Sequence, residues 1–198
     1  MIQTAPQSLG PSLPMAEFAS TEIWNPQRID TLAVYCSDGR WGESFDEFCH
    51  KRLLIPRYDR WAVPGGPAWL VARQPGLQQV ARDQIGFLVR AHELGQIVLI
   101  THFACAYYAQ ALHRDAESCL DEQLADLRHA AQNLHEWFPD LTLATFLAMR
   151  AGNCVTFHRY DPGLAADIDQ QDAEAIEFAV AEVRRRDREL ARRQAGLP

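Results

Sequence analysis

Two short stretches of the chain combine side chains that bind metal ions. They are Cys36-Ser37-Asp38-Gly39-Arg40 and His102-Phe103-Ala104-Cys105. Two thiolates and one imidazole form a nitrogen and sulfur ligand set that zinc accepts. Three ligands are one short of a closed tetrahedral site, so a fourth position would be left for water or substrate. The pattern therefore favours an enzyme over a structural zinc module.

Each stretch directly follows an apolar run that is typical of a buried β-strand. The two runs are 31–35 and 97–101, and both are rich in β-branched or large apolar residues. If these strands are parallel neighbours, the two thiols and the imidazole meet at their carboxyl ends. Ligands of open α/β sheets gather at that edge.

The other elements are expected from hydrophobic periodicity and from turn residues. Helices are predicted over 44–51, 76–94, 121–137 and 172–193, with a further one starting near Cys105; additional strands are predicted over 60–63, 141–149 and 153–158. This alternation predicts an α/β fold, with a mostly parallel central β-sheet flanked by helices. Residues 1–28 are rich in Pro, Ser and Gln and are interpreted as an N-terminal arm. Residues 29–198 are expected to form a single α/β zinc-binding domain that includes the C-terminal helix.

The composition narrows the possible partners and surroundings. The formal net charge of -7 argues against nucleic acid or an anionic membrane as a partner. No apolar run is long enough to span a membrane, and the first 18 residues lack the pattern of a secretory signal. Five cysteines, an odd number, favour a cytoplasmic protein with reduced thiols. Cys49, Cys119 and Cys154 are interpreted as small buried apolar residues.

Several rival sites do not fit the sequence. A phosphatase-type loop needs Arg six residues after its Cys, where this chain has Gly42. No Cys-x-x-Cys pair and no two-His metalloprotease motif is present. Simpler alternatives remain open: Asp38 and Arg40 as a loop-stabilising ion pair, and His102 as a buried histidine bonded to the backbone.

The combined pattern C-x-D-x-R, a long gap and H-x-x-C resembles the β-class carbonic anhydrases, over roughly residues 30–160. The resemblance implies that Zn²⁺ is held by Cys36, His102 and Cys105, with Asp38 and Arg40 as an orienting dyad. It implies interconversion of CO2 and bicarbonate through zinc-bound hydroxide, in a homodimer or a higher homo-oligomer. In some members the aspartate instead binds the metal as a fourth ligand, and the sequence leaves both arrangements open.

The chain departs from that family around the ligands. Where many members carry Arg-Asn-Ala-Gly-Asn or Arg-Asn-Ala-Gly-Gly, this chain has Ala62-Val63-Pro64-Gly65-Gly66. Ala106 replaces the glycine that usually follows the second cysteine. Gly65, Gly66 and Ala106 are the candidate substrate-pocket residues. The altered pocket keeps two alternatives open. One is a zinc hydrolase of a CO2-like compound such as carbon disulfide or carbonyl sulfide, and the other is a weakly active or inactive zinc-binding protein.

Overall fold

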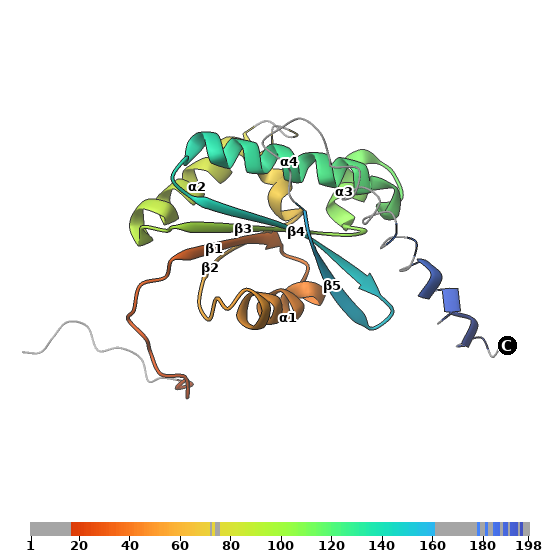
Figure 1. The fold of residues 1–198 in the computed structure, drawn as a ribbon, viewed down its shortest axis with the longest axis horizontal. Coiled ribbons are helices and arrows are strands. Elements are labelled where there is room, and N and C mark those ends of the chain that lie inside the picture. Colours follow the sequence, from red (N-terminus) through yellow and green to blue (C-terminus); the bar gives the residue numbers. More distant parts are fainter. Residues whose placement is uncertain are drawn as a thin grey trace, which may run out of the picture.

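A five-stranded sheet forms the centre of the protein, in the order β2-β1-β3-β4-β5 (Figure 1). This computed structural model describes residues 17–71, 73, 76–160, 178, 181, 184–186, 188–189, 191–193 and 195. The strands are β1 (Thr31–Cys36), β2 (Asp59–Val63), β3 (Gln96–His102), β4 (Thr142–Ala151) and β5 (Cys154–Arg159). The first four run parallel, and β5 pairs antiparallel with β4. The α/β fold with a mostly parallel sheet is confirmed.

Helices cover both faces of this sheet (Figure 1). On one side lie α2 (Leu77–His92) and α4 (Leu120–Trp137), together with the short α3 (Ala106–Leu112). On the other side lies α1 (Gly39–Glu47), which continues as the π-helical turn η1 (Phe48–Arg52). Two 3₁₀ turns, η2 (Gly66–Leu70) and η3 (Ala116–Cys119), follow β2 and α3. Among the described residues, no helix has both the length and the apolar character needed to cross a membrane.

Alternation along β1 and β3 divides the core into two apolar layers. Leu32 and Leu99 pack in the layer beneath α2 and α4, whereas Tyr35 and Ile100 pack in the layer against α1. By the same alternation, the Cys36 side chain points toward the layer beneath α2 and α4. The His102 ring points toward the layer against α1. The strand ends therefore present ligands from both faces, so these side chains can meet only beyond the edge of the sheet.

The helix predicted over 44–51 begins five residues earlier than expected, at Gly39. Asp38 is its N-cap, and the carboxylate accepts a hydrogen bond from the Arg40 N–H at 3.1 Å. Glycines at 39 and 42 weaken the helical pattern, but an Asp before the first turn is itself a start signal. The structure has regular α-helix only as far as Glu47 and a π-helical turn after it.

Two parts of the predicted organisation fall partly outside the described residues. Within the arm, residues 17–28 are described and form neither helix nor strand. Of the helix predicted over 172–193, the described residues are helical, and the rest lies outside the description. The division into an arm and one domain stays a prediction.

Gly66 lies where the turn after β2 touches the end of β1. Its φ is +53°, and a Cβ there would lie 2.7 Å from the Tyr35 carbonyl carbon and 2.8 Å from the Cys36 nitrogen. We expect Gly66→Ala to lower the free energy of unfolding by about 2 kcal/mol, since both the backbone and the contact are strained. Urea denaturation measures this change.

Gly42 provides the matched control, because it lies within α1 and a Cβ there meets no atom within 4 Å. Gly42→Ala is expected to raise the free energy of unfolding by about 0.5–1 kcal/mol. Equal stability of Gly66→Ala and the unaltered protein would contradict the assigned close approach.

Candidate metal centre

The carboxyl ends of β1 and β3 bring three candidate ligands together. The parallel register pairs Tyr35 with Ile100, so Cys36 and His102 reach the same edge of the sheet. Cys105 follows three residues after His102. The ligand atoms of Cys36, His102 and Cys105 lie within 4.8 Å of one another, and all three residues are buried. The convergence expected from the sequence is present.

The spacing of the two sulfurs suits one shared cation. Cys36 Sγ and Cys105 Sγ are 3.8 Å apart. Two thiolates bound to one tetrahedral zinc at about 2.3 Å are separated by about 3.8 Å, from the tetrahedral angle alone. The sulfurs therefore need little movement to bind one such ion.

The imidazole is held so that only one nitrogen is available for binding. His102 Nδ1 donates a hydrogen bond to the Phe103 carbonyl oxygen at 3.0 Å. His102 Nε2 is buried and has no hydrogen-bond partner among the described residues. A buried nitrogen without a partner is costly, and metal-binding histidines typically donate the other ring N–H to a carbonyl or carboxylate. The ring thus fits a metal ion placed at Nε2.

A tight turn delivers Cys105 to the cluster. The Phe103 N–H donates to the Ala148 carbonyl on β4 at 2.9 Å, and Ala104 then takes a φ of +55°. This left-handed conformation costs a non-glycine residue about 1–2 kcal/mol. The turn reverses the chain before α3, and Cys105 is the N-cap residue of that helix.

The two thiols hold their protons with unequal strength. The hydrogen bond from Cys105 lowers the pKa of Cys36, against the opposing effect of burial. Bonds from the N–H groups of Asp38 and Gly65 act in the same direction. The same thiol–thiol bond, together with burial, raises the pKa of Cys105. A cation shared by both sulfurs would relieve this competition for one proton.

Asp38 and Arg40 form a bidentate ion pair beside the cluster. Arg40 Nε donates to Asp38 Oδ1 at 2.9 Å, and Arg40 Nη2 donates to Oδ2 at 2.5 Å. These bonds lower the pKa of the Asp38 carboxyl to about 2, so the group is charged at neutral pH. The carboxylate is thus paired with Arg40, and the choice between this pairing and direct binding to a metal ion stays a prediction.

The candidate pocket residues occupy different positions around the ligands. The Gly65 N–H donates to Cys36 Sγ at 3.4 Å, and its φ of +79° requires glycine. The Tyr107 ring packs onto Gly65, since a Cβ there would lie 2.7 Å from Tyr107 Cγ. Gly66 packs against the backbone of Tyr35 and Cys36, whereas Ala106 is exposed at the start of α3.

The remaining cysteines differ among themselves. Cys49 and Cys119 are buried, as expected, and Cys119 Sγ donates to the Asp115 carbonyl oxygen at 3.3 Å. Cys154 was expected to be buried but is exposed, because it lies directly after the turn between β4 and β5. None of the three belongs to the described group of possible metal ligands.

Two residues that contact His102 were not predicted from the sequence. Gln123 of α4 is fully buried, and its Nε2 donates to the His102 carbonyl oxygen at 2.8 Å. The sequence does indicate that Gln123 is unusual. It lies four residues before Leu127 on the buried face of the helix, where polar residues are rare. Trp41 of α1 lies against the His102 ring. No sequence pattern points to that contact.

A buried polar network lies behind Cys105. Tyr108 packs in the same apolar cluster as Cys105, and its hydroxyl donates to Asp126 Oδ2 at 2.9 Å. Arg73 forms an ion pair with the same carboxylate. The network fixes α3 against α4 and so supports the turn that carries Cys105.

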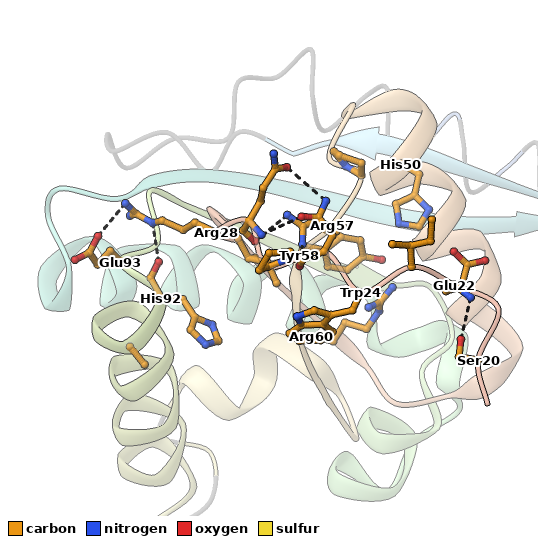
Figure 2. Close-up of a pocket in the computed structure, with 17 residues that line it drawn as sticks. Ser20, Glu22, Trp24, Arg28, His50, Arg57, Tyr58, Arg60, His92 and Glu93 are labelled. Atoms are coloured by element: carbon orange, nitrogen blue, oxygen red, sulfur yellow. Dashed lines mark hydrogen bonds and ion pairs between the residues drawn. The ribbon is translucent and has the colours of Figure 1, made fainter. Parts of the chain in front are cut away.

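A concavity of about 920 Å³ lies at the amino ends of the strands, away from the ligand cluster (Figure 2). It is bounded by residues 20–29, by 56–58 and by the end of α2. Its arginines already have partners: Arg57 donates to the carbonyls of Asn25 and Gln27, and Arg28 pairs with Glu93. The groove thus serves to anchor the segment before β1 and takes no part in the metal cluster.

No family model matches this chain, and no curated protein matches it. Two solved structures are similar to it. β-Carbonic anhydrase isoform I of the protozoan Trichomonas vaginalis has 13% identity and a TM-score of 0.43, covering 69% of this chain and 87% of that chain. The β-carbonic anhydrase CafA of the fungal pathogen Aspergillus fumigatus has 16% identity and a TM-score of 0.41, covering 75% of this chain and 81% of that chain. Values this low do not assign an activity to this chain.

Replacing Cys105 tests the ligand set. Cys105→Ser removes one thiolate, and we expect it to weaken metal binding by more than the roughly 10- to 100-fold that loss of an outer hydrogen-bond partner costs. Metal content after dialysis against a chelator measures this effect. Cys154→Ser, at an exposed position, is the control and should keep the metal. Full metal retention by Cys105→Ser would contradict the assignment.

Proposed function

We propose that this protein is a zinc-dependent carbonic anhydrase-type lyase that interconverts CO2 and bicarbonate: CO2 + H2O ⇌ HCO3⁻ + H⁺. The observation that carries the proposal is the cluster of Cys36, His102 and Cys105, with an ion-paired Asp38 beside it. This is the arrangement implied by the C-x-D-x-R and H-x-x-C motifs. We place the protein in a reducing cytoplasm, where both thiols stay available.

The donor set favours zinc over other common metal ions. Two thiolates and one imidazole suit zinc, whereas calcium and magnesium prefer oxygen ligands. Three protein ligands leave a fourth position for water or substrate, as in catalytic zinc sites. A zinc ion in such a site supplies a bound water whose pKa is lowered to about 7.

Asp38 and Arg40 provide the orienting groups in this proposal. The carboxylate is charged at neutral pH because Arg40 donates to both of its oxygens. A fixed carboxylate beside the cluster can accept a hydrogen bond and so hold one orientation of the attacking group. In this proposal the two bonds from Arg40 hold the carboxylate in place, so that it orients the attacking group without becoming a fourth ligand.

The surrounding walls suit a small apolar substrate. Gly65 and Gly66 bring the backbone close to Cys36, and the Tyr107 ring covers Gly65. Ala68 and Tyr108 complete the apolar cluster around the two thiols. CO2 is small and uncharged, so it needs such a surface more than a charged clamp. Carbon disulfide and carbonyl sulfide share these properties and are the alternative substrates.

Hydration of CO2 by zinc-loaded protein tests the proposal. In stopped-flow measurements the unaltered protein should exceed the uncatalysed rate. Asp38→Asn should lower kcat/KM by about 10- to 100-fold, since the amide is neutral and loses its ion pair with Arg40. Asp46→Asn is the control, because Asp46 pairs with Arg60 and Tyr58, away from the cluster.

Three outcomes separate the candidate activities. If protein with stoichiometric zinc hydrates CO2 no faster than the uncatalysed rate, the lyase proposal is rejected. Sulfide release from carbon disulfide by that same sample would then support the hydrolase, and absence of both activities would support a zinc-binding protein without catalysis. If Asp38→Asn is as active as the unaltered protein, the orienting role of Asp38 is rejected, while the proposed lyase activity stands.

A second copy of this chain is the proposed partner. Phe18, Ile23 and Trp24 lie in the described part of the arm, and their side chains are more than 80% exposed. Exposed apolar side chains this close together are typical of interaction surfaces. Arg57 anchors the base of this segment through Asn25 and Gln27, which leaves the apolar residues presented outward.

Light scattering after size-exclusion chromatography tests this partner. We expect a mass of two chains or a multiple of it, and a shift toward one chain in the double variant Ile23→Ser, Trp24→Ser, since each loses apolar contact area. Phe87→Ser, on the exposed face of α2, is the control and should not shift. A monomeric unaltered protein at micromolar concentration would contradict the proposal.

A further inference from the structure

An indole ring lies directly against the candidate metal-binding imidazole. The ring centroids of Trp41 and His102 are 4.6 Å apart, and their planes are inclined by 31°. Trp41 is 7% exposed and His102 is 1% exposed. The indole is therefore a close neighbour of the imidazole inside the protein.

The contact follows from the side of the sheet that α1 covers. His102 points to the same face of β3 as Val98 and Ile100, which pack in the layer against α1. Trp41 is the third residue of α1 and belongs to that layer. The helix begins only three residues after Cys36, so its first turn must pass the edge where the ligands meet.

The indole is itself held in place from behind. Trp41 stacks on Phe45 with centroids 6.1 Å apart and planes inclined by 18°. Phe45 is fully buried and packs at 5.1 Å against Tyr35 of β1. Moving the indole would disturb the packing of Trp41, Phe45 and Tyr35. The indole is therefore held rigidly beside the imidazole.

Two further contacts fix the rest of His102. The Nδ1–H bond to the Phe103 carbonyl limits rotation of the ring, and the Gln123 amide holds the main-chain oxygen. Neither contact restrains the flat face of the ring. The indole packs against the ring and adds a third restraint on His102.

We propose that Trp41 is a positioning residue that clamps the His102 ring for metal binding; this inference rests on the proposed zinc site. An imidazole bound to a dication becomes electron-poor, and the face of an indole attracts positive charge. Trp41 therefore both orients the ligand and stabilises its bound form. Removal of an outer contact to a metal ligand typically costs about 10- to 100-fold in affinity.

Zinc affinity, measured by competition with a chromophoric chelator, tests the role of Trp41. We expect Trp41→Leu to bind zinc about 10- to 100-fold more weakly, while Trp41→Phe, which keeps an aromatic face, stays within about threefold of the unaltered protein. Trp41→Met fills the space without an aromatic ring and should have the same zinc affinity as Trp41→Leu. It provides the test if the leucine variant does not fold.

Trp61→Leu is the matched control. Trp61 is as buried as Trp41 but packs in the opposite layer, against Trp69. It should lose stability in urea while keeping its zinc affinity. Unchanged affinity in Trp41→Leu or Trp41→Met, or equal loss in Trp61→Leu, would overturn the inference while the zinc site stands. Failure of the unaltered protein to bind zinc would instead overturn the proposed function, and this inference with it.

Discussion

The parallel pairing of β1 with β3 is the constraint on which the site depends. It brings Cys36 and His102, which are far apart in the sequence, to one edge of the sheet. Alternation along the strands then turns the two side chains toward opposite layers, so the cluster forms beyond the last hydrogen-bonded pair. The turn through Ala104 supplies Cys105 at the same point. A shift of β1 by one residue in this register would turn Cys36 to the opposite face of the sheet, away from the other ligands.

The helix α1 joins the structural and chemical parts of this arrangement. Its N-cap is Asp38, its first turn contains Arg40, and its third residue is Trp41. The position of α1 thus determines both the Asp38–Arg40 ion pair and the contact of Trp41 with His102. The helix is fixed in turn by the aromatic packing of Phe45 beneath β1. Changes in the packing of this layer are therefore transmitted to the ligands.

The sequence predicted those features that depend on local pattern. Apolar runs located the strands, and ligand types at their ends indicated the cluster of Cys36 and His102. The start of α1 was missed because glycines weaken the helical pattern around Trp41, although Asp38 offered a capping signal. The contact between Trp41 and His102 depends on which face α1 covers, and the contact of Gln123 depends on how α4 lies over the sheet. Both are set by tertiary packing, which no local pattern reports.

X-ray absorption at the zinc edge of the purified, zinc-loaded protein tests the central claim most directly. The proposed site predicts two sulfur ligands at about 2.3 Å, one imidazole nitrogen at about 2.0–2.1 Å and one further oxygen, with one zinc per chain. Those values would show the ligand set of two sulfurs and one nitrogen, with oxygen at the fourth position. A site without sulfur ligands, or one closed by four protein nitrogen and sulfur ligands, would contradict the account.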